Sequence, residues 1–582
     1  MARMRMSSRA LAKVGVATLL AAAACGYAGG ASSPKGGQPG STGSSNGAAT
    51  GAAGSVGGIS EPPAGGAAGS STGAAGADTL PPEMEVDNSY KAPVATGHFV
   101  WIANPTSGRI AYVDATSLVV KTVEAGNGPT YLAAVPGTQD AVIVLNVLSN
   151  DSTFLRASNG AIDSRTIEGV APGSNAWAVS PDGRYALAWT DARQLPAAPE
   201  TQGFHDVTII DLLATPPAAA ATTLAVGYRP VSISFSDDKT KAFAVTQDGV
   251  SVVALAQAAV VDTVPLGANG VTDPEDTHDV SVTLDGKLAV VRRDGAAGVA
   301  VVDLATHDRT EIPLSGVVTD VDVSSDGKVA VAVVRGTAEV AILPLAGHAP
   351  ALADVQHLTI TGETVGQVTL TAGGTVAVLY SNAFPSERLS VVTLGATPAF
   401  HVVRLHAPVL SALPTADGKF AVALHADIPT PPTPAAADGG ADGGTDASIN
   451  TPPPELTTTT PPAIAFSLVP LDGSQPARIE TADAPIQSVA IAPNSTSVLL
   501  TQRDDAKNVF GAFLGLMPSL KVAKYPLASP PSAAGIVGGA NRGYVAQEYG
   551  DGRITFLPLD GGDARTLTGY ELGARVVQWS PQ

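Results

Sequence analysis

A motif of four short apolar segments recurs ten times between Phe99 and the end of this 582-residue chain. The first copy reads FVWIANPTSGRIAYVDATSLVVKTVEAGNGPTYLAAVPG, and another clear copy reads KLAVVRRDGAAGVAVVDLATHDRTEIPLSGVVTDVDVSSDG. The segments are rich in Val, Ala and Ile, as buried strands are. A repeat of about 40–50 residues with four strands per copy is typical of a β-propeller, in which each copy forms one blade.

The spacing of the copies supports this count. Eight of the nine intervals between copies span 41–56 residues, and the ninth spans 78. The long interval contains residues 427–462, which are rich in Pro, Thr, Gly and Ala, and we interpret them as a disordered insert in the eighth repeat. The copies begin near Phe99, Ala141, Tyr185, Lys241, Lys287, Lys328, Thr375, Lys419, Ser497 and Gly543.

Several copies share a tight turn, which appears as SPDGR at 180–184, TLDGK at 283–287, SSDGK at 324–328 and TADGK at 415–419. Asp-Gly tolerates the positive φ that tight hairpins require. In propellers the strand before this turn is usually the innermost of its blade. The sequence therefore places an innermost strand directly before each of these turns.

The two ends of the repeat region suggest how the ring closes. The chain enters with a second-strand segment at 99–103 and ends with an innermost-type segment at 575–580. We expect residues 575–580 to pair with residues 99–103, complete the first blade and remove the open sheet edges. The predicted fold is all-β, with one closed ring of ten four-stranded blades over residues 95–582; two smaller rings are the alternative.

Residues 1–24 have the order of a secretory signal peptide, with a basic start, an apolar centre and a run of alanines. Cys25 is the only cysteine in the protein. The sequence LLAAAAC resembles a bacterial lipobox, although Ala22 stands where that family usually has Leu. The resemblance implies cleavage before Cys25, its acylation and a lipid anchor in the membrane. Cleavage at an ordinary Ala-x-Ala site is the alternative.

Between the signal and the repeats, residues 25–94 are mainly Gly, Ala, Ser, Thr and Pro. Such a segment buries little apolar surface, so we expect a disordered tether with a reach of roughly 40–50 Å. Gly26 is not the Asp that commonly retains lipoproteins in an inner membrane. The expected location is therefore the outer membrane, facing the periplasm or the cell surface.

The formal net charge of −19 makes a phosphate backbone an unfavourable partner, so no nucleic acid is expected. The repeats FVWIANPTSGRIAYVDATSLVVKTVEAGNGP and PGSNAWAVSPDGRYALAWT resemble the YVTN-type propeller repeats of bacterial surface and lactonase-like proteins. The resemblance extends from about Phe99 to the end of the chain, with the tetrapeptide itself changed to WIAN, IVLN and LAWT. It implies a propeller, in a family that includes binding proteins, surface-layer components and a few enzymes.

The sharpest polar cluster is TDPEDTHD at 272–279, where Asp273, Glu275, Asp276 and His278 are weak candidates for a metal site or for acid–base chemistry. The alternative is that His278 belongs to a structural strand opening preceded by an acidic loop. The nine histidines show no zinc-site spacing, and the chain has neither a Gly-x-Ser-x-Gly elbow nor a P-loop. We therefore expect no catalytic residues, metal or cofactor.

Three functions remain open at this stage. The first is a non-catalytic, membrane-anchored propeller with a monomeric body that binds a protein or an envelope glycan. The second is a lactonase-like hydrolase that uses the 272–279 cluster at the channel mouth. The third is a structural component of the cell envelope.

Overall fold

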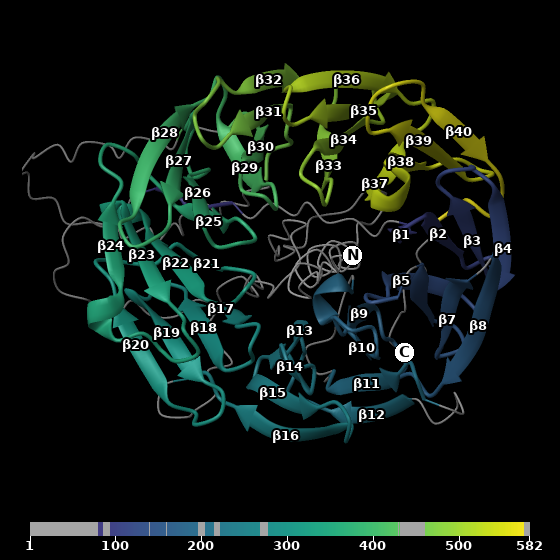
Figure 1. Cartoon of the computed structure of the whole chain (residues 1–582), viewed down its shortest axis with the longest axis horizontal. Helices are drawn as coiled ribbons and strands as arrows, with labels where there is room; N and C mark the ends of the chain where they lie inside the picture. Colours follow the sequence, from purple (N-terminus) through teal and green to yellow (C-terminus); the bar gives the residue numbers. More distant parts are fainter. Residues whose placement is uncertain are drawn as a thin grey trace, which may run out of the picture.

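The computed structural model describes residues 80–84, 93–138, 140–158, 160–195, 204–214, 221–267, 278–428, 430 and 460–574. Within these ranges, forty strands form ten four-stranded antiparallel sheets. The sheets stand around one central axis, with the first strand of each blade innermost and the fourth on the outer wall (Figure 1). The predicted ten-bladed propeller in a single ring is confirmed, and so is the innermost position of the strand before each Asp-Gly turn.

The blades are numbered 1–10 in chain order, and each takes four consecutive strands. Blades 1–5 comprise β1 Val94–Ala95, β2 Phe99–Asn104, β3 Arg109–Asp114, β4 Val120–Glu124; β5 Pro129–Ala134, β6 Ala141–Asn146, β7 Asp151–Ser158, β8 Ala161–Glu168; β9 Ala176–Val179, β10 Tyr185–Trp189, β11 Asp206–Asp211, β12 Ala221–Ala225; β13 Ser232–Phe235, β14 Lys241–Thr246, β15 Gly249–Ala254, β16 Ala259–Val264; β17 His278–Val282, β18 Leu288–Arg293, β19 Gly298–Asp303, β20 Arg309–Pro313.

Blades 6–10 continue the pattern. They comprise β21 Asp320–Val323, β22 Val329–Val334, β23 Glu339–Pro344, β24 Gln356–Thr359; β25 Gln367–Leu370, β26 Val376–Tyr380, β27 Arg388–Thr393, β28 Ala399–Arg404; β29 Val409–Pro414, β30 Phe420–His425, β31 Ala465–Pro470, β32 Arg478–Thr481; β33 Ile486–Ile491, β34 Ser497–Asp504, β35 Val509–Leu516, β36 Lys521–Pro526; β37 Pro531–Val537, β38 Arg542–Gln547, β39 Arg553–Pro558, β40 Arg565–Thr568.

The core lies between neighbouring blades. Leu288 and Val301 of blade 5 pack in one buried cluster with Ala332 and Leu343 of blade 6. Because each second and third strand is covered on both faces in this way, its residues are apolar at consecutive positions. The fourth strands line the outer wall instead, and β4 is mostly exposed along its length.

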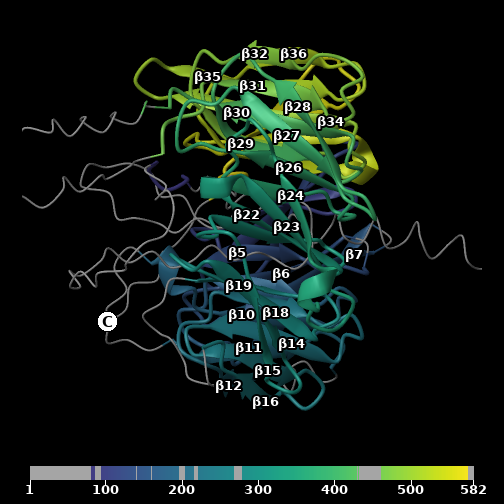
Figure 2. The same cartoon turned by 90° about the vertical axis from the view of Figure 1, so that its left-hand side faces the viewer.

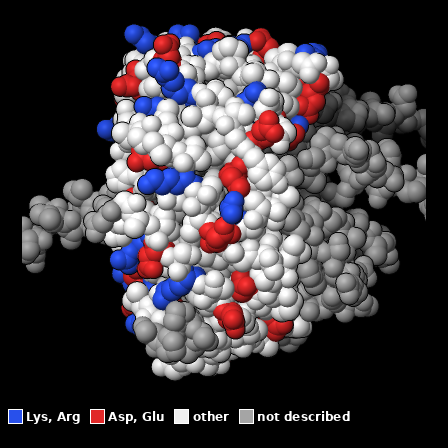
Figure 3. All heavy atoms as spheres, turned by 90° about the vertical axis from the view of Figure 1, so that its right-hand side faces the viewer, with Lys and Arg blue, Asp and Glu red and all other residues white. Residues whose placement is uncertain are grey.

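Charged residues of both signs are interspersed on the outer wall around β4 and β8 (Figure 3). Arg109 and Glu124, for example, form an exposed ion pair of 2.8 Å on this side. The described surface in this view therefore has no extended patch of one sign that could steer a charged partner.

A side-chain hydrogen bond fixes five of the turns between first and second strands. In each, a Ser or Thr hydroxyl donates to the Asp two residues later, over 2.6–2.8 Å. The pairs are Ser180–Asp182, Ser236–Asp238, Thr283–Asp285, Ser324–Asp326 and Thr415–Asp417. Short polar side chains of this kind stabilise tight turns locally.

The antiparallel order gives the ring two different faces. The turn face carries the connections between first and second strands and between third and fourth strands. The loop face carries the connections between second and third strands and between successive blades. Residues 196–203, 268–277 and 431–459 all belong to connections of the loop face. The predicted insert at 427–462 thus joins β30 to β31 in blade 8, as expected, and most of it lies outside the described residues.

The first blade is completed differently from our expectation. Its inner position is taken by β1, where Val94 pairs with Trp101 and Ala95 with Val100. The segment expected there, residues 575–580, lies outside the described residues.

Side chains of blades 1 and 10 close the ring. Val100 and Ile102 of β2 pack in one buried cluster with Tyr544 and Phe556 of blade 10. The Tyr544 hydroxyl donates to the carbonyl of Pro93, which directly precedes β1. The described closure is therefore a packed interface between two complete blades.

Candidate functional site

The acidic segment at 272–279 is only partly described. Asp273, Glu275 and Asp276 lie outside the described residues, as does the His278 side chain, although the backbone of His278 pairs with Arg293 at the start of β17. Asp279 accepts a hydrogen bond of 2.6 Å from Nε of Arg292 on β18. One carboxylate of the segment is thus held in an ion pair between adjacent strands.

Arg292 is held by more than one carboxylate. Burial lowers the pKa of Arg292, but Asp279, Asp294 and Asp320 together raise it above its ordinary value. The guanidinium is therefore permanently charged and keeps Asp279 engaged. This arrangement supports a structural role for the one described carboxylate of the predicted cluster.

Two further observations concern metals and membranes. Among the residues that the structure describes, no three His, Cys, Asp or Glu side chains gather in a way that could hold a metal ion. In the same ranges, no helix is both long and apolar enough to cross a membrane. The predicted lipidation residue, Cys25, lies outside them.

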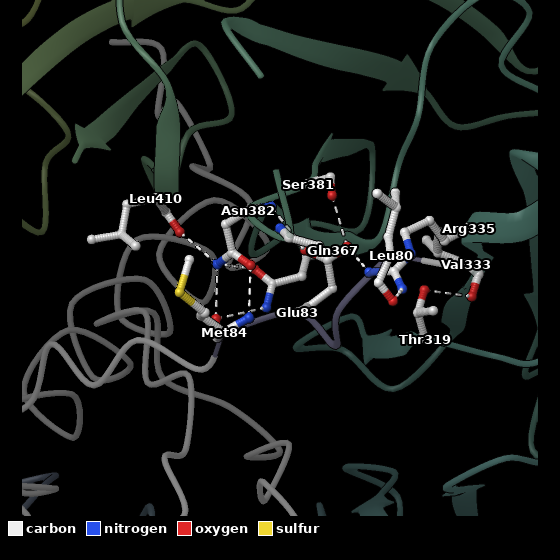
Figure 4. Close-up of polar contacts among 11 residues, drawn as sticks. Leu80, Glu83, Met84, Thr319, Val333, Arg335, Gln367, Ser381, Asn382 and Leu410 are labelled. Carbon is white, nitrogen blue, oxygen red and sulfur yellow. Dashed lines mark hydrogen bonds and ion pairs between the residues drawn. The ribbon is translucent and has the colours of Figure 1, made fainter. Parts of the chain in front are cut away.

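The best-formed polar site holds a piece of the chain itself. Residues 80–84, which the sequence analysis placed in the disordered tether, lie on the loop face against blades 6, 7 and 8 (Figure 4). We call this segment, Leu80–Met84, the docked segment. Figure 2 shows the ring from the side on which these blades lie.

The docked segment inserts one carboxylate into a closed pocket. Glu83 forms an ion pair of 2.7 Å with Nη1 of Arg335, which follows β22 in blade 6. Each of the two side chains is only 5% exposed. Both charges are thus removed from water, and such a pair is stable only when further hydrogen bonds satisfy it.

Blade 7 supplies those hydrogen bonds from the connection after β26. Oε1 of Glu83 accepts from the Ser381 hydroxyl at 2.7 Å. Oε2 accepts from the backbone N–H of Asn382 at 2.8 Å and of Ala383 at 3.1 Å. With Arg335, four donors surround one carboxylate, and donors to an ionised acceptor make the stronger hydrogen bonds.

The next residue of the segment is held by its backbone. Met84 N–H donates to Oδ1 of Asn382 at 2.7 Å, and Nδ2 of Asn382 donates back to the Met84 carbonyl at 2.8 Å. Gln367 donates to the same carbonyl at 3.2 Å. The Asn382 amide thereby pairs with the backbone of Met84 as a neighbouring strand would. These two hydrogen bonds do not involve the Met84 side chain.

Apolar contact and close approach complete the site. The Met84 side chain packs against the buried cluster that includes Leu410 and Leu424 of blade 8. At Gly366, any Cβ would collide with the Glu83 carboxylate, so a glycine there leaves room for the ligand. The site therefore holds the Glu83 carboxylate by charge and hydrogen bonds, and the adjacent Met84 by its backbone and by apolar packing.

Sequence reasoning missed this site because its parts are far apart in the chain. Glu83 and Asn382 are separated by 299 positions, and two of the donors are backbone N–H groups. One signal was available: LPPEM at 80–84 contains a large apolar residue at each end, within a stretch dominated by small residues, and the whole chain has only five methionines.

A second hollow lies on the turn face between blades 1 and 2, with a volume of about 680 Å³. Its lining includes Phe99 and Tyr112 from blade 1 together with Lys121, Asp140 and Arg156. Asp140 accepts hydrogen bonds of 2.8 Å from the hydroxyl of Thr96 and from the backbone N–H of His98, so it also fastens the β1–β2 hairpin to blade 2.

Comparison with protein-family models gives no match, and neither does comparison with curated proteins. Solved structures with similarity include the dihydro-heme d1 dehydrogenase NirN in complex with DHE, at 13% identity over 67% of this chain and 73% of that chain, with a TM-score of 0.38. A eukaryotic initiation factor matches at 14% identity over 72% of this chain and 96% of that chain, with a TM-score of 0.44.

Hydrazine synthase of Kuenenia stuttgartiensis matches at 14% identity over 58% of this chain and 95% of that chain, with a TM-score of 0.30. Such values carry no argument about function. The strand pairing of the chain itself identifies it as a ten-bladed β-propeller.

Proposed function

We propose that this protein is an exported, non-catalytic binding module, anchored to the bacterial outer membrane through acylated Cys25, whose propeller binds a protein of the cell envelope. The signal-like residues 1–24, the cysteine that follows them and the similarity of the repeats to YVTN-type surface proteins support export and anchoring. The body is proposed to act as a monomer, without a cofactor.

One observation carries the binding function: the loop face holds an extended stretch of polypeptide in a pocket shaped for it. Arg335, Ser381 and Asn382 contact the docked segment through charge, hydroxyl and amide groups that converge from two blades. A face that holds one segment in this way has the chemistry to bind others. A structural envelope component would not need such a pocket.

The anchor is tested by mass analysis of the mature N-terminus and by cell fractionation, with Cys25→Ala as the variant. We expect the wild-type protein to begin at an acylated Cys25 and to fractionate with the outer membrane. The variant should lose the acyl mass and leave the membrane fraction. An unchanged membrane fraction in the variant would refute the anchor.

Binding is tested with the full-length Cys25→Ala chain as bait against solubilised envelope extract, with cross-linking and mass spectrometry. The expected result is a protein cross-linked to blades 6–8 of the loop face. Cross-links scattered over the outer wall, with none on the loop face, would contradict the proposal.

The hollow between blades 1 and 2 favours an envelope glycan as a second candidate ligand. The aromatic residues Phe99 and Tyr112 line the hollow together with Lys121 and Arg156, and small-molecule sites commonly combine apolar and polar groups in this way. Retention on immobilised envelope glycan that is lost in Lys121→Ala and Arg156→Ala would support it. Retention that both variants keep would exclude this hollow.

A further inference from the structure

We propose that the pocket around Arg335 is a recognition site for acidic extended peptides of a partner protein, and that the docked segment occupies it as an intramolecular competitor. This inference rests on the proposed binding function and names its ligand: an extended chain with a glutamate followed by an apolar residue. The partner would bind by displacing Leu80–Met84.

The pocket selects its ligand by the charge and the hydrogen-bonding groups of one side chain. The buried Arg335 guanidinium needs a carboxylate, because a neutral amide in its place would leave the cation without a counter-ion. The two donors from the backbone of Asn382 and Ala383 meet the second carboxylate oxygen. A glutamine at this position would present an N–H₂ group to those donors or to Arg335, so it should bind poorly.

Most of the described interactions would be available to a segment from another molecule. Arg335 and Ser381 of the propeller donate to the Glu83 carboxylate, which any glutamate could supply. Gln367 and Asn382 donate to the backbone carbonyl of Met84, which any residue could supply. The docked segment differs from a partner only in its covalent link, through residues 85–92, to blade 1, whose first strand begins at Val94. Because a covalent link makes binding of the docked segment intramolecular, a free peptide must compete with its effective concentration.

The test uses the full-length Cys25→Ala protein and a fluorescent peptide with the sequence of residues 78–86, DTLPPEMEV, followed by anisotropy. We expect weak binding to the chain with an intact docked segment. Glu83→Gln in the protein should weaken the internal segment and tighten peptide binding at least tenfold. A peptide with Gln in place of its first glutamate after the prolines should not bind.

Two substitutions in the propeller, outside the docked segment itself, should disable the pocket. Arg335→Gln removes the counter-ion, and Gly366→Ala places a methyl group where the carboxylate lies. Each, combined with Glu83→Gln, should abolish peptide binding. Arg388→Gln is the matched control, because Arg388 lies in blade 7 but pairs with Glu363 and is 42% exposed. Absence of peptide binding to a folded Glu83→Gln protein would overturn the proposal.

A second measurement applies if Glu83→Gln does not fold. A site-specific protease sequence inserted between Asp87 and Asn88 allows the folded protein to be cut, so that the docked segment can exchange for labelled peptide. Exchange in the cut protein but not in the uncut protein is expected; no exchange in either contradicts the proposal. If the peptide fails in both experiments while envelope cross-links to the loop face persist, only this inference fails and the proposed function stands.

Discussion

At the scale of single residues, the ring depends on polar groups placed between blades. Asp320 and Asp322 of β21 accept hydrogen bonds from backbone N–H groups of β25, the innermost strand of the next blade, at 2.8 and 2.7 Å. These carboxylates link blade 6 to blade 7 where the strands are closest together. Because the link is ionisable, it should respond to pH.

Asp322 is expected to make stability depend on pH. Burial raises its pKa to about 6, although hydrogen bonds from Leu370 and Val323 act against this. A carboxyl whose pKa is higher in the folded state favours folding when protonated, so its contribution falls as pH rises from about 4 to 6 and is lowest above that range. A rise of the pKa from 3.8 to about 6 limits the change in the free energy of unfolding to about 3 kcal/mol.

The measurement is the free energy of unfolding in denaturant between pH 4 and pH 8. Relative to Asp322→Asn, the wild-type protein should lose stability as pH rises through this window. The exposed Asp560→Asn serves as the control and should follow the wild type. Parallel curves for wild type and Asp322→Asn would show that Asp322 does not titrate as expected.

The glycine of the SPDGR turn at 180–184 is constrained both by its backbone conformation and by a close neighbour. Gly183 has φ +70°, and a Cβ there would collide with the carbonyl oxygen of Pro136 in the adjacent blade. Gly183→Ala should therefore cost more than the roughly 1 kcal/mol of backbone strain alone. Gly160→Ala isolates that strain, because Gly160 has φ +79° and no neighbour within 4 Å of a Cβ. Equal losses in thermal melting temperature for the two variants would contradict the close approach.

At the scale of elements, blade 8 shows how the propeller carries extra chain. His425 at the end of β30 pairs with Ala465 at the start of β31, and the pairing continues without a break to Phe420 and Pro470. The predicted insert therefore interrupts a hairpin whose two strands are already in register. Its ends are fixed by the sheet, whatever length lies between them.

Replacing residues 431–459 by a short Gly-Asn-Gly linker should leave the fold intact. Closure entropy depends only logarithmically on loop length, so shortening the loop should change stability by about 1 kcal/mol. Circular dichroism and the melting temperature provide the measurement, with the full-length protein as reference. Loss of the β-sheet signal would mean that the insert takes part in folding blade 8.

At the scale of the whole molecule, the ring is closed by two adjacent complete blades. Asn104 of β2 donates to the carbonyl of Tyr570 at 2.9 Å, and Ser107 donates to Glu571 at 2.6 Å. These bonds, with the buried cluster around Tyr544, join the beginning and the end of the described propeller. Closure of this type buries the apolar faces that the first and last blades would otherwise expose.

This closure predicts different results for truncation at the two ends. Removing residues up to Ala95 deletes β1, whose two residues are each 3% exposed, and should lower the melting temperature markedly. Because this truncation also deletes the docked segment, its reference is a chain that begins at Pro93 and keeps β1. Removing residues 575–582 should have a much smaller effect. The comparison is made by thermal unfolding; the Cys25→Ala chain is the reference for the C-terminal truncation, which is made in that background. A larger loss from the C-terminal truncation would favour the strand exchange that the sequence suggested.

Features of this protein could be predicted from its sequence where the interacting groups lie close together along the chain. Ten blades followed from local signals, because each Asp-Gly turn is fixed within a few residues of its own hairpin. The two-residue β1 is too short for any periodic pattern. The pocket for Glu83 joins groups that only the folded ring brings together. The candidates Asp273, Glu275 and Asp276 lie outside the described residues, so the prediction made for them stays a prediction.

The difference between the turn face and the loop face affects how such a protein can evolve. The Ser180 and Thr415 turns allow almost no added length, since their neighbours are close, whereas the connection from β30 to β31 accommodates 39 residues between paired positions 425 and 465. The connection from β23 to β24 on the turn face has 11 residues, and the largest addition therefore lies on the loop face. A lineage of these rings would be free to diversify what it recognises there, while the short turns of the opposite side stay geometrically constrained.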